Sequence, residues 1–331
     1  MGELEDFQRE TKEFIKKVES SGYTVGLELE FLYTPEVFPK NPGDYQRVWN
    51  EIAKALEPVA ANYPTKRGDV KPQVMVFSKE GYTPWGHTKD VREKFVISED
   101  ATIIPSDCGK EVRIEVSTPV MENGSWIDVI PMMMKHLGDT SRVSFNNSTG
   151  LHIHLGVGVG KSFSLPQSKK IAEAIIIFER QLDTLHPTRG TFRNRGREDT
   201  FYKCVSENKA LRGLDTKQKI ELISAVEDEG SAEENYPPEA GLLRLINPDG
   251  DGGWEKNYAY HFGSIEAYGT IEFRQAIGTL DARWTLDWTR RIISLVEKAI
   301  HTTDGEFLRW AENGINDEEV YQSFGVPAPE T

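Results

Sequence analysis

Apolar and polar side chains alternate strictly in several short stretches of the chain, as in strands that bury one face. In YTVGLELEF, residues 23–31, the valine, leucines and phenylalanine alternate with Gly26, Glu28 and Glu30. The same alternation recurs in EVRIEVS (111–117), TGLHIHLG (149–156) and TIEFRQ (270–275). Each of these strands is therefore expected to carry charged or imidazole groups on the face opposite its apolar one.

Longer stretches show the apolar period of about 3.6 residues that is typical of amphipathic helices. They cover residues 3–20, 43–61, 126–138, 165–186, 215–228, 282–301 and 304–312. Further strands are expected near 72–77, 93–104, 256–263 and 269–276, the last two as an antiparallel pair around SIEAYG. Because the strands group as hairpins rather than alternating one by one with helices, the pattern favours an α+β fold.

Two segments rich in acidic residues, glycine and proline predict loops. They are EDEGSAEENYPPEAG (227–241) and NPDGDGG (247–253). Around them we expect three parts: an N-terminal helix (1–22) packed on the domain, a single catalytic domain (23–315), and a C-terminal tail (316–331).

Composition narrows the classes of partner. The net charge of −14 argues against a nucleic acid or an anionic membrane surface as the main partner. No apolar run of about 18 residues predicts a membrane span, and MGELEDFQRE lacks the apolar core of a signal peptide. Two cysteines, Cys108 and Cys204, are too few for a disulfide framework. A cytoplasmic protein without membrane association is expected.

The polar faces of the four alternating strands carry an unusual set of groups. They supply Glu28, Glu30, Glu115, Glu272, His152 and His154. A single Glu-x-Glu face is ordinarily the solvated side of a sheet. If the four strands adjoin, however, carboxylates about 7 Å apart repel by roughly 2–3 kcal/mol at an effective dielectric constant of about 20. Divalent cations offset such repulsion, and oxygen-rich sites with an imidazole suit Mg²⁺ or Mn²⁺.

Arginines add a second kind of chemistry. Arg274 shares a strand face with Glu272, and further guanidinium groups follow in TRGTFRNRGREDTFYKC at Arg189, Arg193, Arg195 and Arg197. Planar guanidinium donors suit phosphate or carboxylate, although this segment is equally consistent with a surface loop. Metal ions with arginines are the usual elements of phosphoryl transfer. The chain has no GxxxxGK[ST] segment, which excludes a P-loop enzyme.

The four strand motifs, in the order in which they occur along the chain, resemble those of the amidoligase family. This family is a branch of the carboxylate–amine ligase superfamily, which includes glutamine synthetase and glutamate–cysteine ligase. The resemblance rests on GLELEF, EVRIEVSTPV, NNSTGLHIHLG and GTIEFRQAIGTLD, and spans roughly residues 23–300. It implies a glutamine-synthetase-like catalytic domain, with a curved, mostly antiparallel sheet backed by helices. It also implies an ATP-dependent ligase that forms an amide, isopeptide or γ-glutamyl bond through an acyl phosphate.

The resemblance also assigns roles to individual residues. Two ions of Mg²⁺ or Mn²⁺ would bind between ATP and the carboxylate substrate. Their ligands would be Glu28, Glu30, Asp100, Glu115, His152 and Glu272. Arg274 would contact the transferred phosphate, alone or with the arginines of residues 189–197, and His154 would face the substrate. Glu111 is a candidate general base because of its place on the polar face, and His261 stands where such enzymes usually have asparagine.

Several alternatives stay open at this point. The substrates are expected to be a small-molecule or peptide carboxylate and an amine, and a homo-oligomer is compatible with the sequence. A metal-dependent amide or phosphate-ester hydrolase would also use histidines and carboxylates, and a glutamate–cysteine-ligase-like enzyme would make a small γ-glutamyl compound. A non-catalytic descendant would bind nucleotide or peptide alone. The loops within 229–253 are candidates for a lid that excludes water, or are inert surface loops.

Overall fold

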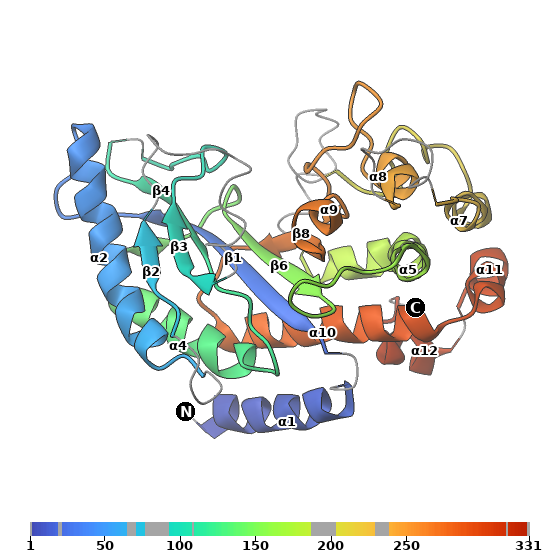
Figure 1. Ribbon diagram of the computed structural model, residues 1–331, viewed down its shortest axis with the longest axis horizontal. Coiled ribbons are helices and arrows are strands. Elements are labelled where there is room, and N and C mark those ends of the chain that lie inside the picture. The colour runs from blue at the N-terminus through green and yellow to red at the C-terminus, as the bar shows by residue number, and fades with distance from the viewer. Residues whose placement is uncertain are drawn as a thin grey trace. The chain divides into compact units, whose positions relative to one another are not determined.

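The computed structural model divides the chain into two compact units (Figure 1). The first comprises Met1–His154 and Ala276–Trp288, and the second comprises Leu155–Gln275 and Thr289–Thr331. The structure describes residues 2–18, 22–64, 71–76, 93–107, 109–186, 203–228, 238–315 and 317–329. It is a mixed α/β fold with a mostly antiparallel sheet backed by helices, which confirms the fold class expected from the sequence.

In the first unit, β1 (Thr24–Tyr33) occupies the centre of the strand order. It pairs antiparallel with β4 (Val112–Ser117) and, at its end, with β5 (Val143–Ser144). On the far side of β4 lie antiparallel β3 (Phe95–Ser98) and then parallel β2 (Val74–Val76). Beyond β1 follows β6 (Gly150–Gly156), so that β4 and β6 flank the strand that carries Glu28 and Glu30.

The apolar positions of β1 are in the core of the first unit. Leu27, Leu29 and Phe31 are at most 1% exposed, as the alternation predicts. Helices α2 (Pro42–Ala61) and α4 (Trp126–Asp139) pack on each other, and α2 also packs on β2 and β3. The N-terminal helix α1 (Gly2–Val18) lies against α4 (Figure 1), where Lys12 pairs with Asp128 at 2.8 Å.

The second unit contains a short antiparallel pair and a group of helices. Strand β7 (Tyr260–His261) pairs with β8 (Thr270–Ile277), whose last two residues belong to the first unit, and α9 (Ser264–Tyr268) joins them. Three helices pack on one another: α5 (Leu165–Thr184), α7 (Thr216–Ser224) and α11 (Asp304–Asn313). The remaining ones are α8 (Ala240–Ile246), α10 (Ala282–His301, which begins in the first unit) and α12 (Glu318–Ser323).

A buried carboxylate on α5 fixes the chain at residues 205 and 206 of the second unit. Glu179 on α5 is 2% exposed, and its two oxygens accept the backbone N–H groups of Val205 at 2.8 Å and Ser206 at 3.0 Å. Just before them, the Lys203 N–H donates to the carbonyl of Asn257 at 2.8 Å. These bonds anchor residues 203–206 to both a helix and the segment that precedes β7.

The structure differs from the sequence-based expectations in several elements, and the strand expected at 93–104 is shortened to Phe95–Ser98. The strand expected at 256–263 is reduced to the two residues of β7, and SIEAY forms helix α9, which ends at Gly269 with φ +74°. Helix α8 begins inside a segment expected to be loop, and buries Ala240, Leu243 and Ile246 at helical spacing. Helix α12 lies in the expected tail. The domain boundaries at 22 and 315 stay predictions. Among the described residues, no helix has the length and apolar character needed to cross a membrane.

Candidate functional site

Strand register in the first unit gathers three carboxylates. Glu30 on β1 lies opposite Glu115 on β4, which in turn lies opposite Ser98 on β3. Asp100 follows β3 by two residues. Glu30, Asp100 and Glu115 each offer one oxygen, and these oxygens all lie within 4.8 Å of one another. The hydroxyl of Ser98 donates to Glu115 Oε1 at 3.3 Å, which helps to hold that carboxylate in place.

This carboxylate cluster (Glu30, Asp100, Glu115) has the chemistry of a site for a hard cation. Glu30 is 1% exposed, so water screens its charge poorly. Two ionised carboxylates about 5 Å apart repel by roughly 3 kcal/mol at an effective dielectric constant of about 20. Mg²⁺ and Mn²⁺ prefer carboxylate oxygens and offset this repulsion. The donor set therefore fits the divalent ion that the resemblance implies.

Both histidines of β6 point at the carboxylates of β1. The Nδ1 of His152 is 3.3 Å from Glu28 Oε2, and its Nε2 is 3.4 Å from Glu30 Oε1. The Nε2 of His154 is 3.3 Å from Glu28 Oε1. Gly26 allows this approach, since a Cβ there would lie only 3.3 Å from the Cβ of His154. His152 thus lies between Glu28 and Glu30 and contacts both carboxylates.

In the second unit, the predicted pair Glu272 and Arg274 also lies together. Both side chains are buried on one face of β8, and Arg274 Nη1 forms an ion pair with Glu272 Oε1. The other oxygen, Oε2, is 3.0 Å from Nδ1 of His261 and 3.3 Å from the hydroxyl of Ser264. Charge-assisted contacts of this kind restrict both the carboxylate and the guanidinium to one orientation.

The serine, histidine and glutamate of this group do not form a hydrolase triad. Ser264 Oγ lies 3.0 Å from Nδ1 of His261, the same nitrogen that contacts Glu272. A triad needs the nucleophile on one ring nitrogen and the acid on the other, so that the ring can relay a proton. Ser264 is also only 2% exposed. This arrangement holds Glu272 in place rather than activating Ser264.

Other predicted residues have different surroundings. Glu111 precedes β4, and its Oε2 accepts the backbone N–H groups of Ser106 at 2.7 Å and Asp107 at 2.9 Å, so this carboxylate stabilises a turn. Arg189, Arg193, Arg195 and Arg197 lie outside the described residues. The sequence interpretation missed Ser98 and Ser264, because serine is common on strand faces and in turns and only the register reveals its carboxylate partner.

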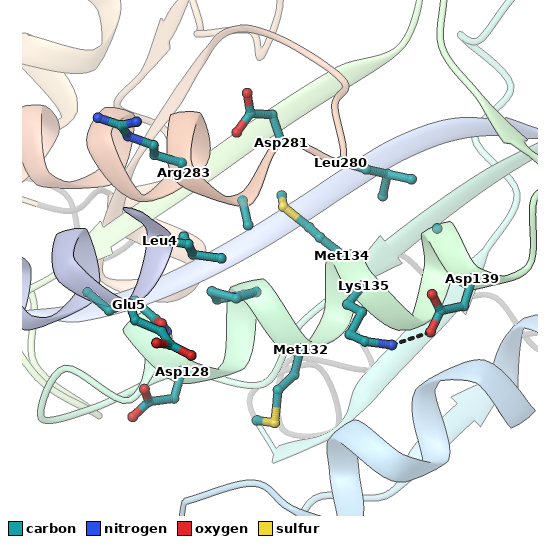
Figure 2. A pocket seen from close by; sticks show the side chains of 14 residues that line it. Leu4, Glu5, Asp128, Met132, Met134, Lys135, Asp139, Leu280, Asp281 and Arg283 are labelled. Atoms are coloured by element: carbon teal, nitrogen blue, oxygen red, sulfur yellow. Dashed lines mark hydrogen bonds and ion pairs between the residues drawn. The ribbon is translucent and has the colours of Figure 1, made fainter. Parts of the chain in front are cut away.

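A groove in the first unit is separate from these residues (Figure 2). It has a volume of about 840 Å³, and its lining includes the apolar residues Leu4, Met132 and Leu280. None of the predicted site residues that the structure describes lines it. Its charged lining residues include Lys135, which pairs with Asp139 at 2.5 Å.

Comparison with known proteins gives the family. No curated protein matches the chain. Among solved structures it is similar to the Plasmodium falciparum glutamine synthetase, with 10% identity and a TM-score of 0.35 over 89% of this chain and 55% of that one. It is also similar to a novel glutamine synthase homologue, with 11% identity and a TM-score of 0.42 over 97% and 67% of the two chains. The chain thus spans about half the length of the first of these proteins.

The family model that matches covers most of the sequence. It is described as "Putative amidoligase enzyme" and matches residues 21–295, which contain every candidate site residue named above. Membership of this family supports a ligase. The chain belongs to the amidoligase family.

Proposed function

We propose that the protein is an ATP- and Mg²⁺-dependent carboxylate–amine ligase that forms an amide bond through an acyl phosphate. The observation that carries the proposal is the carboxylate cluster of Glu30, Asp100 and Glu115, found in a chain of the amidoligase family. The family provides the reaction class, and the cluster provides a place for the divalent ion that nucleotide chemistry requires. The substrates proposed are a small-molecule or peptide carboxylate and an amine.

The reaction needs activation because an amine does not displace the oxygen of a carboxylate. In the proposed first step, a carboxylate oxygen attacks the γ-phosphorus of ATP, the bond to the β-phosphate oxygen breaks, and ADP leaves. In the second step, the amine nitrogen attacks the acyl carbon, inorganic phosphate leaves, and the nitrogen gives up a proton. A bound divalent ion would supply neutralisation of charge on the phosphate oxygens. Water must be excluded while the acyl phosphate exists.

The roles proposed for the chain's own residues follow from their contacts. Glu30, Asp100 and Glu115 would hold one ion, and Glu28 with His152 would serve a second one. Glu272 is proposed as a further metal ligand. Arg274 would donate to the transferring phosphate with its guanidinium oriented by Glu272. His154, which contacts the Oε1 oxygen of Glu28, would face the substrate.

The proton acceptor for the amine is a separate question. Glu111, proposed from the sequence, already accepts two backbone N–H groups. Acting as a base would require those bonds to weaken, because protonation reduces the acceptor strength of the carboxylate. If a Glu111→Gln variant retains turnover, Glu111 stabilises the turn and is not the proton acceptor.

A hydroxamate assay tests the function. The protein is incubated with ATP, Mg²⁺, hydroxylamine and a panel of carboxylates, and ADP and hydroxamate are both measured. A ligase releases ADP and hydroxamate in equal amounts and needs both ATP and Mg²⁺. Product formation that persists without ATP would overturn the proposal in favour of a hydrolase. The variant Glu30→Gln should abolish turnover, whereas the exposed Glu57→Gln on α2 serves as the matched control.

A further inference from the structure

We propose that His261 is a positioning residue that holds the carboxylate of Glu272 in the orientation needed to bind a divalent ion. This inference rests on the proposed function, because it takes Glu272 as a metal ligand. His261 lies directly opposite Glu272 in the antiparallel register of β7 and β8. Opposite residues of such a pair have neighbouring Cβ atoms, so their side chains interact directly.

The contacts of Glu272 show that both of its oxygens are engaged. Arg274 takes Oε1, while Oε2 is 3.0 Å from Nδ1 of His261 and 3.3 Å from the Ser264 hydroxyl. Without a donor from His261, only the longer contact from the Ser264 hydroxyl, at 3.3 Å, would balance the ion pair between Glu272 and Arg274. His261 therefore opposes the pull of Arg274 and leaves Glu272 fixed between the two.

The position of the His261 ring is restricted by the neighbouring Gly263 and by the backbone on either side of His261. A Cβ at Gly263 would lie 2.5 Å from Nε2 of His261 and 3.0 Å from Cδ1 of Trp254, so only a glycine at 263 leaves room for the ring. The backbone on either side is fixed by Asn247, which is fully buried. Its Nδ2 donates to the carbonyl of Tyr260 at 2.8 Å, and its Oδ1 accepts from the N–H of Phe262 at 2.7 Å.

The geometry also defines which atom of His261 matters. Nδ1 faces a carboxylate oxygen, which accepts hydrogen bonds, so in this proposal Nδ1 carries the ring hydrogen. The amide nitrogen of an asparagine is separated from its Cβ by the same number of bonds as Nδ1 is in histidine. Asparagine at this position therefore keeps the donor, whereas leucine has a similar size and no donor. The pair of variants separates hydrogen bonding from the filling of space.

The test is the equilibrium binding of Mn²⁺ to the full chain, measured by calorimetry without ATP. The wild type should bind two ions. His261→Leu should weaken one of them by about 10–100-fold, the usual cost of removing a partner of a metal-binding carboxylate, and leave the other unchanged. His261→Asn should stay within about threefold of the wild type. His301→Asn on α10, with a side chain that is 68% exposed, is the matched control.

Each outcome has a defined meaning. Wild-type affinities in His261→Leu, or equal losses in His261→Asn and His261→Leu, would overturn the inference; the second result would make the ring itself the ligand. Should His261→Leu fail to fold, Gly263→Ala replaces it, because this change displaces the ring while keeping the histidine. A wild type that binds no Mn²⁺ and forms no hydroxamate refutes the proposed function instead.

Discussion

Glu30 on β1 and Glu115 on β4 face each other across an antiparallel strand pair, and both have an oxygen within 4.8 Å of an oxygen of Asp100. Like charges placed directly opposite in a sheet destabilise it. The repulsion between Glu30 and Glu115 therefore lowers the free energy of unfolding of the metal-free protein, and such local destabilisation is common at functional sites. Two measurable consequences follow, one for the metal-free protein and one for the metal-bound protein.

The first prediction concerns the thermal stability of Glu30→Gln. In EDTA its melting temperature should exceed that of the wild type, because one of the repelling charges is gone. Saturating Mg²⁺ should raise the melting temperature of the wild type, since an ion at about 100 times its dissociation constant stabilises by about 2.7 kcal/mol. The variant should lose the part of this response that comes from the ion at the carboxylate cluster, and Glu57→Gln should keep all of it. A full Mg²⁺ response in Glu30→Gln would contradict the assignment of the cluster. Scanning fluorimetry checks both effects.

The second prediction concerns Arg274→Lys. Lysine keeps the positive charge beside Glu272 but replaces the planar fork of donors by a point charge. We expect the rate of ADP formation to fall on the order of 100-fold, the typical loss when one transition-state donor is removed. Mn²⁺ affinity should remain unchanged. The exposed Arg309→Lys on α11 is the control. An equal loss of activity and metal affinity would instead show that Arg274 acts only through Glu272.

The third prediction concerns the turn between α9 and β8. Gly269 has φ +74°, and a Cβ there would lie 2.2 Å from the backbone oxygen of Lys161. Gly160 has nearly the same φ, +71°, with no atom within 4 Å. Gly160→Ala should therefore lower the free energy of unfolding only by the penalty for a left-handed conformation, about 1–2 kcal/mol. Gly269→Ala should lower it by clearly more. Urea unfolding of the two variants isolates the clash; equal losses would mean that the backbone relaxes freely.

The fourth prediction concerns the pH dependence of stability. Glu173 on α5 is 1% exposed, and burial raises the pKa of its carboxyl above 4.5, although the Ser224 hydroxyl bond acts in the opposite direction. A raised pKa means that the folded state binds the proton more tightly than the unfolded state. The stabilisation of the folded state by protonated Glu173 is thus fully present below about pH 4.5, and it is lost as the pH rises through the folded-state pKa.

Glu173→Gln removes this titration. The difference in melting temperature between Glu173→Gln and the wild type should therefore grow in favour of the variant from pH 4.5 to pH 7.5. The exposed Glu221→Gln on α7 should show no such trend. A difference that stays constant with pH would show that Glu173 ionises in the folded protein as it does in the unfolded chain.

The sequence predicts the faces of the strands well because side-chain alternation is a local property of the backbone. Glu28 and Glu30 share a face, and His152 and His154 share another, as the pattern requires. The partners across strands do not follow from that pattern. That Glu30 meets Glu115, and that His261 meets Glu272, depends on register, which long-range packing and turn geometry set.

Two further differences have local causes. The alternation of EVRIEVS continues through Glu111, but β4 begins at Val112, because the backbone N–H of Glu111 donates to the carbonyl of Asp107 in the preceding turn at 3.1 Å. Helix α8 was missed because seven residues flanked by acidic, proline and glycine positions give too short a window for a helical period.

The anchor at Glu179 has an evolutionary consequence. Glu179 lies on helix α5, and its buried carboxylate accepts the backbone N–H groups of Val205 and Ser206. Because these bonds use backbone N–H groups, they depend on the carboxylate at position 179 and not on the identity of the side chain at position 206. Relatives that exchange Ser206 are therefore expected to retain the anchor as long as they keep an acidic residue at position 179.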